Sequence, residues 1–279
     1  MAHPVVTLLT DFGTADAYVG IMKGIILALN PDARLVDLTH QVAPQDIRTG
    51  AGVLAEAAPA FPPGAIHLAV VDPGVGTERR PLLVSSPTAF FVCPDNGLLS
   101  LVLARAGAQA DADGTAALPS GWSAVHLTNP AYWRAPVSAT FHGRDVFAPV
   151  AAHLSVGVRP GELGTPIQRV AAFPAPVPRR DGDALMGEVV RVDRFGNLLT
   201  NIPADLLPAG GMVSVAGQGA GRVLHTYADG PPGAPLALVG SDGCLEVAVP
   251  QGSAAALLGV GVGAVVVVRG PSDSPIQQA

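Results

Sequence analysis

A chain of 279 residues can bury a large hydrophobic core, and its length favours one large domain or two unequal ones. Because 49% of the residues are hydrophobic and only 14% are charged, the composition excludes a disordered chain. A formal net charge of −6 argues against a general nucleic-acid-binding protein, since such a protein needs a basic surface.

The sequence predicts neither a signal peptide nor a membrane anchor. Residues 1–9 lack a basic start, and Asp11 interrupts the first apolar run. The longest apolar stretch, residues 254–268, is too short to span a bilayer comfortably. We interpret it as two buried strands around a turn. We therefore expect a cytoplasmic protein without a membrane partner.

Strand-like and helix-like segments alternate through the first half of the chain. This alternation predicts a mainly parallel sheet with helices on both faces, which is an α/β fold. The predicted segments are strands at 5–9, 34–38, 65–71, 81–86 and 89–93 and helices at 16–29, 44–58, 96–103 and 145–156.

The pattern changes at a proline-rich segment, which we interpret as a linker over residues 173–185. Beyond it, short β-type runs are separated by Gly, Pro and Asp, with no convincing helix. They predict a smaller all-β barrel or sandwich. The expected domains are thus an α/β domain at 1–172, the linker and a β domain at 186–279.

The most informative motif runs from Asp72 to Arg79. Asp72 directly follows a predicted strand, and a Pro-Gly-Val-Gly turn leads on to Arg79. In α/β proteins ligands collect at the carboxyl ends of the strands, and glycines let the backbone fold closely around them. His142, in Phe141-His142-Gly143-Arg144-Asp145, supplies a proton-handling side chain before another predicted helix. Asp, Arg and His together can orient a small anion or an ionising water. The alternative is a purely structural role, as a capped turn with a surface arginine.

Asp11 ends the first predicted strand in the string Thr10-Asp11-Phe12-Gly13. A carboxylate there can accept two hydrogen bonds from a ribose diol, as acidic residues do in dinucleotide-binding folds. A helix-capping role is the alternative. The Asp-Phe-Gly string also occurs in protein kinases, but the motifs that accompany it in kinases are missing.

Several side chains near the predicted strand ends are of types that bind Zn, Mn or Fe. They have no diagnostic spacing, so we expect no metal site. His40 by itself is more typical of a hydrogen-bonded turn. These side chains are Asp11, Asp37, His40, Asp72 and His142.

The predicted β domain carries two further polar motifs. Asp193, Phe195 and Asn197 could recognise an amino-acid zwitterion or the edge of a base, with the aromatic ring stacking on the base. Ser241 and Glu246 lie on a later predicted hairpin and could supply hydroxyl and carboxylate contacts to the same ligand. Taken singly, both motifs are also common in β-turns.

Taken together and in order, six motifs resemble one family, the S-adenosyl-L-methionine (SAM) hydroxide adenosyltransferases or SAM hydrolases. This family is related to the SAM-dependent fluorinase and chlorinase. The resemblance covers residues 7 to about 250. The motifs are TDFG at 10–13, DPGVGTER at 72–79, PDNGL at 94–98, FHGRD at 141–145, DRFGNLxTN at 193–201 and SDGxLE at 241–246.

The resemblance implies that Asp72, Arg79 and His142 orient and activate a water or hydroxide. This nucleophile attacks the ribose C5′ of SAM in line and gives adenosine and L-methionine. SAM is then the substrate, and no separate cofactor is needed. A sulfonium is an excellent leaving group, so such an enzyme has to supply only a positioned, partly desolvated oxygen nucleophile.

The family's binding roles transfer to matching positions of this chain. The resemblance implies that Asp11 binds the ribose hydroxyls, while Asp193 and Ser241 hold the amino and carboxylate ends of methionine. It also implies that Phe195 and Asn197 contact adenine. Glu246 belongs to the same motif as Ser241. Family members are homotrimers whose active sites lie between the N-terminal domain of one subunit and the β domain of its neighbour.

Two other functions remain as alternatives. A SAM-dependent halogenase is disfavoured, because halogenases have Tyr and Ser where this chain has Asp72 and Gly143, and a carboxylate repels a halide. They also have an arginine where this chain has Asp242, which leaves carboxylate binding there in question. A non-catalytic SAM or adenosine sensor could keep Asp11 but lose the nucleophile-handling residues, all of which are present here.

Overall fold

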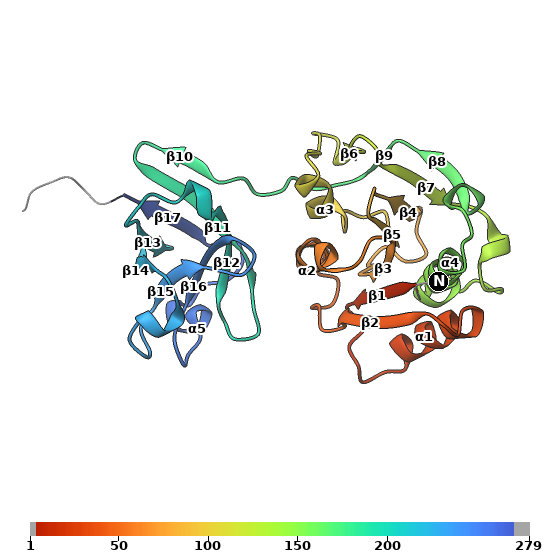
Figure 1. Cartoon of the computed structure of the whole chain (residues 1–279), viewed down its shortest axis with the longest axis horizontal. Coiled ribbons are helices and arrows are strands. Elements are labelled where there is room, and N and C mark those ends of the chain that lie inside the picture. Colours follow the sequence, from red (N-terminus) through yellow and green to blue (C-terminus); the bar gives the residue numbers. More distant parts are fainter. Residues whose placement is uncertain (1–3, 271–279) are drawn as a thin grey trace, which may run out of the picture. The chain divides into compact units, whose positions relative to one another are not determined.

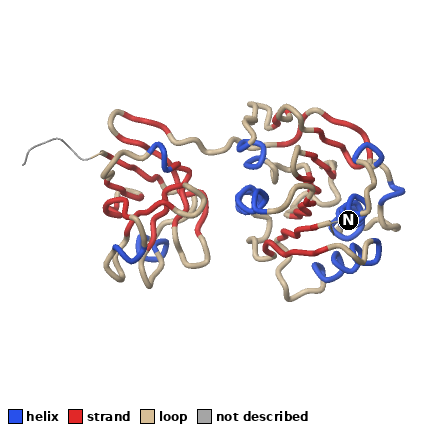
Figure 2. Tube along the Cα trace, in the orientation of Figure 1, coloured by secondary structure: helices blue, strands red, loops and turns tan. Residues whose placement is uncertain are grey.

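The computed structural model describes residues 4–270, which fall into two compact units divided between Ala175 and Pro176 (Figure 1). Figure 2 shows that helices are concentrated in the first unit and that the second consists mostly of strands. The division lies inside the segment that the sequence marks as a linker. That segment also contains β10 (Arg179–Asp181) and the start of β11 (Ala184–Val192).

The first unit is built around a seven-stranded mixed sheet in the order β2-β1-β3-β5-β4-β7-β8. The neighbours β2, β1, β3 and β5 are parallel, and only β4 and β8 run opposite to the other five strands. The predicted α/β class is therefore confirmed. The elements are β1 (Val5–Thr10), α1 (Tyr18–Leu29), β2 (Arg34–Thr39), α2 (Ile47–Ala57), β3 (Ala65–Val70), β4 (Pro81–Ser85), β5 (Ala89–Pro94), α3 (Ser100–Arg105), β6 (Thr115–Ala117), β7 (Ser123–Leu127), α4 (Ala148–Ser155), β8 (Gly164–Ile167) and β9 (Arg169–Ala171).

Helices cover both faces of this sheet, which explains the near-continuous apolar character of its central strands. On one face, Val6 and Leu8 of β1 pack with Met22 of α1 and with α4. On the other face, Leu9 packs in a cluster with Leu54 of α2 and with α3. Alternate residues of one strand thus enter different cores, as the twofold repeat of a strand requires.

The helix boundaries differ from the sequence prediction where polar side chains bond to backbone. Asp46 caps α2, because its carboxylate accepts from the Thr49 amide at 3.0 Å. Asn96 forms a turn instead of starting a helix, so α3 begins only at Ser100. The predicted helix at 145–156 is split into a π-helical turn, η3 (Gly143–Phe147), and α4.

His67 of β3 is a fully buried histidine in the second of these cores. Its Nδ1 lies 2.8 Å from Thr7 Oγ1, and its ring contacts Phe61 and Phe91 with centroid distances of 5.7 and 5.1 Å. Burial lowers the pKa of His67 from 6.5 to about 4. The ring is therefore neutral in the folded protein at any pH above about 4.

His67 should make the protein less stable in mild acid. Between pH 6.5 and about 4 the unfolded chain binds a proton at this residue that the folded chain does not. The free energy of unfolding should then fall by about 1.4 kcal/mol per pH unit from this group alone. Urea unfolding at several pH values measures this slope. His67→Asn, which keeps a partner for Thr7 but cannot titrate, should flatten it; an identical slope in both proteins would contradict the prediction.

The second unit is a closed barrel of seven strands in the order β11-β12-β16-β15-β14-β13-β17, closed by pairing of β17 with β11. Neighbouring strands are antiparallel except β14 and β15. The barrel prediction is confirmed. The additional elements are β12 (Leu198–Pro203), β13 (Met212–Val215), β14 (Gln218–Leu224), β15 (Leu236–Val239), β16 (Cys244–Ala248), α5 (Ala254–Leu258) and β17 (Val265–Arg269).

The prediction of two strands over residues 254–268 is wrong. The first half of this stretch is the short helix α5, and only the second half is a strand, β17. Ser253 caps the helix by accepting from the Ala256 amide at 3.1 Å, and Gly259 ends it at a φ of +63°. Serine before and glycine after an apolar run are helix signals, and here they outweigh the run's strand-like composition.

None of the helices in residues 4–270 combines the length and apolar character needed to cross a membrane.

Candidate active site

The four parallel strands of the first unit each bring a carboxylate to the same edge of the sheet. Asp37 lies near the end of β2, and Asp11, Asp72 and Asp95 follow β1, β3 and β5. Because these strands are neighbours and point the same way, their carboxyl ends meet at one edge. This edge is where open α/β sheets bind ligands.

Asp72 and Arg79 form a buried ion pair at this edge. Arg79 Nε donates to Asp72 Oδ1 at 2.8 Å, and Arg79 Nη2 donates to Oδ2. The two side chains are only 5% and 8% exposed, so the pair is largely shielded from water. The intervening loop needs Gly76, which has a φ of +79° and whose added Cβ would lie 2.4 Å from the Ala139 carbonyl oxygen.

His142 joins this pair. Its Nδ1 lies 2.8 Å from Arg79 Nη2, and a guanidinium can only donate, so Nδ1 is the acceptor. Burial and the charge of Arg79 hold the pKa of His142 below its ordinary value, which favours a neutral ring at pH 7. The third guanidinium nitrogen, Arg79 Nη1, is buried and has no acceptor among residues 4–270. The structure thus brings Asp72, Arg79 and His142 together and leaves Arg79 Nη1 as a donor without an acceptor in the described residues.

Asp145 fixes the loop that carries His142. Its side chain is fully buried, accepts from Arg144 at 2.7 and 2.8 Å and from the Ser138 amide at 2.8 Å, and lies 3.3 Å from Arg134. These contacts tie both ends of the segment 134–145 to one carboxylate. Asp145 is thus the centre of the hydrogen bonding of this loop.

Phe12, next to Asp11, and Phe141, next to His142, pack against each other, so the two loops lie close together. Phe12, Tyr18 and Phe141 form a mutual edge-to-face cluster with ring centroids 5.1 to 6.0 Å apart. Asp11 Oδ2 accepts from the Gln45 amide at 2.7 Å. Asp11 Oδ1 accepts no hydrogen bond within the described part of the chain and is available to a ligand.

Within residues 4–270, no group of three or more His, Cys, Asp or Glu side chains is arranged to hold a metal ion. Three of the four carboxylates at the sheet edge pair with basic side chains: Asp37 with Lys23, Asp72 with Arg79 and Asp95 with Arg80.

In the second unit, Asp193 organises its own turn. Its Oδ1 accepts from the amides of Phe195 and Asn197 at 2.9 Å, and its Oδ2 accepts from Asn197 Nδ2 at 3.0 Å. Asn197 is buried, whereas Phe195 is 76% exposed. The turn therefore exposes the Phe195 ring to solvent, while hydrogen bonds hold the Asp193 carboxylate and the Asn197 amide in place.

Glu246 and Ser241 lie on the predicted hairpin, which β15 and β16 form. Glu246 is buried and accepts from the Tyr227 hydroxyl at 2.6 Å, and Ser241 is exposed. Burial and the nearby charges of Asp193 and Asp242 raise the pKa of Glu246. Because the charge of Asp193 acts on Glu246, the two predicted motifs of the barrel lie near each other.

Sequence reasoning missed Tyr227, which lies in the turn η6 (Tyr227–Asp229) after β14. Its hydrogen bond to Glu246 raises the pKa of Tyr227 to about 12, so it remains a donor at neutral pH. The Thr226–Asp229 capping pair is the signal that could have marked a turn there.

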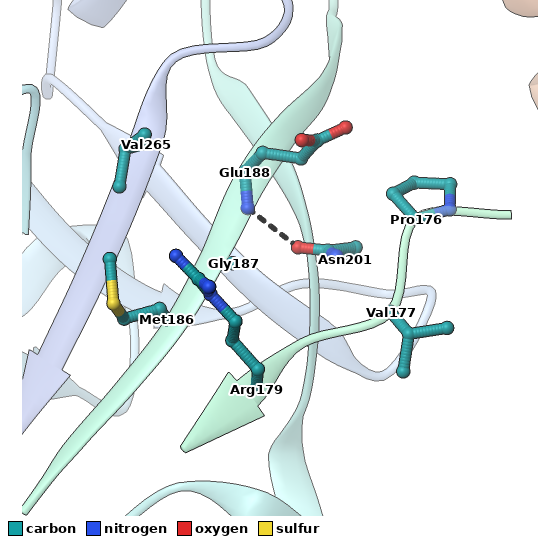
Figure 3. A pocket seen from close by; sticks show the side chains of 8 residues that line it. All are labelled: Pro176, Val177, Arg179, Met186, Gly187, Glu188, Asn201 and Val265. Atoms are coloured by element: carbon teal, nitrogen blue, oxygen red, sulfur yellow. Dashed lines mark hydrogen bonds between the residues drawn. The ribbon is translucent and has the colours of Figure 1, made fainter. Parts of the chain in front are cut away.

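A cavity of about 180 Å³ lies on the barrel and contains none of the predicted site residues (Figure 3). The Glu188 amide donates to Asn201 Oδ1 at 2.7 Å across its wall. A Cβ added at Gly187 would lie 2.4 Å from Asn201 Oδ1 and from Ile202, so glycine allows β11 and β12 to approach there. The lining residues are Pro176, Val177, Arg179, Met186, Gly187, Glu188, Asn201 and Val265.

Comparison with known proteins identifies the family of this chain. Residues 6–164 match the model of the SAM hydroxide adenosyltransferase N-terminal domain, and residues 187–267 match that of the corresponding C-terminal domain. These two ranges contain all of the candidate site residues: Asp11, Asp72, Arg79, His142, Asp193, Phe195, Asn197, Ser241 and Glu246.

Individual relatives span nearly the whole chain. A protein named (R)-S-adenosyl-L-methionine hydrolase, from Salinispora tropica, is 44% identical over 92% of this chain and 94% of its own length. A fluorinase from an Actinoplanes species is 27% identical over 75% of each chain. The crystal structure of an uncharacterized conserved protein from Thermotoga maritima is 34% identical, with a TM-score of 0.85, over 95% of this chain and 99% of that one. The chain belongs to the SAM hydroxide adenosyltransferase family.

Proposed function

We propose that this protein hydrolyses SAM to adenosine and L-methionine. Family membership and the similarity to proteins named SAM hydrolases support the substrate and the reaction. The observation that carries the mechanism is the position of Arg79, which holds Asp72 and His142 together and keeps one buried nitrogen without an acceptor.

Arg79 Nη1 is the proposed donor to the oxygen nucleophile. A buried N–H without a partner is costly, so an oxygen that accepts from it gains a strong, charge-assisted hydrogen bond. The guanidinium also stabilises negative charge that develops on this oxygen as it loses its proton. Removal from bulk water and alignment with the C5′–S bond then supply much of the rate acceleration.

The reaction balances with one water molecule. The water oxygen forms a bond to C5′, the C5′–S bond breaks, and its electron pair goes to the sulfur of methionine. One proton leaves the attacking oxygen. Asp72 is the nearby group that can accept this proton before it reaches solvent, whereas neutral His142, whose Nδ1 accepts from Arg79 and whose Nε2 carries the ring proton, helps to orient Arg79.

The binding roles are assigned to the remaining candidates. Asp11 binds the ribose hydroxyls through its unoccupied carboxylate oxygen. Asp193 and Ser241 bind the methionine end, and Glu246 contributes to the same end. Phe195 and Asn197 contact adenine, the exposed ring of Phe195 by stacking.

We also infer a homotrimer in which these two sets of residues come from neighbouring subunits. The support is the family resemblance and the distribution of the candidates over two separate units of the chain. Light scattering of the purified protein measures the subunit number.

A halogenase is the second candidate, favoured by the similarity to a fluorinase. Two features oppose it. Asp72 places negative charge where a halide would have to bind. At Gly143, an added Cβ would lie 3.2 Å from Met22 Sδ and from Phe141, so a serine could enter only if the aromatic cluster shifted.

The deciding experiment incubates the purified protein with SAM, with and without chloride and with and without EDTA. We expect adenosine and methionine in equal amounts under all conditions, detected by chromatography. A chloride-dependent 5′-chloro product would assign the chain to the halogenases. Tight SAM binding without turnover would identify a sensor, and loss of activity in EDTA would point to a metal-dependent hydrolase.

A further inference from the structure

A line of polar contacts runs from the surface to the base of the Asp11 loop. Lys23 Nζ of α1 donates to Asp37 Oδ2 at 2.6 Å, and Asp37 Oδ1 lies 3.0 Å from His40 Nε2. His40 is buried, whereas Asp37 is exposed. Burial raises the pKa of Asp37, but the contacts with Lys23 and His40 outweigh this and hold it below its ordinary value.

The line continues from His40 into the loop that carries Asp11. His40 Nδ1 lies 2.9 Å from Oγ1 of the fully buried Thr10, and the same hydroxyl accepts from the Phe12 amide at 3.2 Å. The Gly13 amide donates to the His40 carbonyl oxygen at 2.8 Å. His40 thus contacts the residue before Asp11 through its ring and the second residue after it through its backbone.

The donors and acceptors in this line have one consistent direction. Asp37 Oδ1, 3.0 Å from His40 Nε2 but not aligned for a hydrogen bond, favours a proton on that nitrogen by its charge, which leaves Nδ1 as an acceptor. The Thr10 hydroxyl then donates to Nδ1, and its oxygen accepts from the Phe12 amide. Each group has a definite role, so the loop backbone on both sides of Asp11 is fixed.

We propose that His40 is a positioning residue for substrate binding, which acts through Thr10 to hold Asp11 where it can bind the ribose hydroxyls. This inference rests on the proposed function and assigns a role to the Asp37–His40 pair, which the catalytic chemistry does not use. It accounts for a buried histidine at a strand end that belongs to no potential metal-binding group within residues 4–270 and lies outside the cluster of Asp72, Arg79 and His142 (the Arg79 cluster).

The chain contains a matched control for this contact. Thr7 and Thr10 both lie on β1, both are fully buried, and each places its hydroxyl within 2.9 Å of a histidine Nδ1. Thr7 pairs with His67, in the core, and Thr10 pairs with His40, beside Asp11. Valine at either position removes one hydroxyl at nearly constant shape. Only Thr10→Val should disturb the Asp11 loop.

The experiment measures kcat and KM for SAM in the full-length protein and four variants. Thr10→Val and His40→Gln, which keeps a donor for Asp37 but not the acceptor for Thr10, should each raise KM about tenfold, the effect of one lost hydrogen bond. In both, kcat should stay within about threefold of wild type, because the Arg79 cluster is untouched. His40→Asn, whose side-chain oxygen can replace Nδ1, should restore KM, and Thr7→Val should leave it unchanged.

Hydrogen exchange of the segment 10–17 gives a second readout that does not require activity. Exchange at Phe12 and Gly13 should accelerate in Thr10→Val and not in Thr7→Val. Wild-type protein that does not hydrolyse SAM would refute the proposed function, while the exchange result would still decide whether His40 holds the loop. Unchanged exchange in Thr10→Val, an equal rise of KM in Thr7→Val, or a fall confined to kcat would overturn the inference.

Discussion

Replacement of Asp72 by alanine should lower kcat for SAM hydrolysis by about a thousandfold, within the range for loss of a catalytic acid or base. Asp72 accepts both hydrogen bonds that orient Arg79, and Arg79 in turn contacts His142, so one substitution disorganises all three groups. Adenosine affinity should change little, because Asp72 is not assigned to the ribose or the base. Steady-state kinetics and calorimetry with adenosine measure the two effects separately.

Asp95→Ala is the matched control for this substitution. Asp95 lies at the end of the neighbouring strand β5, its side chain is also only 5% exposed, and it pairs with Arg80 as Asp72 pairs with Arg79. Its loss should reduce stability but leave kcat within about tenfold of wild type, since it touches none of the three catalytic groups. Turnover in Asp72→Ala as high as in Asp95→Ala would refute the role of Asp72.

The second large effect is expected at Asp145. Asp145→Ala should reduce the free energy of unfolding by about 3 kcal/mol, because it removes a fully buried carboxylate that pairs with arginine and accepts from backbone. The partial exposure of Arg144 and Arg134 keeps the loss at the lower end of the range for buried pairs. Activity should fall as well, because the released loop carries His142. Urea unfolding measures the stability change.

Glu162→Ala provides the comparison for Asp145. Its carboxylate also pairs with an arginine, Arg159, at 3.0 Å, but both side chains are exposed. Exposed pairs of this kind contribute little to stability, so the variant should unfold almost like wild type. Similar losses in the two variants would show that burial of Asp145 is not what makes its pair important.

The position of Asp11 and Asp72 at one edge of the sheet could be predicted from the sequence, because each follows a strand. Asp11 and Asp72 come directly after apolar runs whose alternation with helices indicates parallel neighbours, and parallel neighbours end at one edge. The contact of Arg79 with His142 joins residues 63 positions apart, and no local pattern encodes it. The residue types suggested that the two motifs act together, and the family resemblance implied it, but the contact itself is seen only in the structure.

Short elements, and side chains whose roles depend on contacts across loops, were harder to predict. β12 lies within a motif that was read for its polar residues, although Leu198, Thr200 and Ile202 alternate inward. α5 is only five residues long, so its caps were the sole helix signal against an apolar run typical of strands. The roles of Asp145, His40 and Tyr227 depend on contacts across loops, which a single sequence does not show.

The charges of the four carboxylates at the sheet edge affect both substrate binding and product release. Three of them are neutralised by Lys23, Arg79 and Arg80, whereas Asp11 has no ion-pair partner in residues 4–270. The edge therefore keeps about one unit of uncompensated negative charge, and SAM, with its sulfonium, ammonium and carboxylate, carries one net positive charge. Cleavage converts this cation into uncharged adenosine and zwitterionic methionine and releases a proton. The negative sheet edge thus attracts the cationic substrate. Once the C5′–S bond is broken, neither product carries a net charge, so this attraction does not oppose product release.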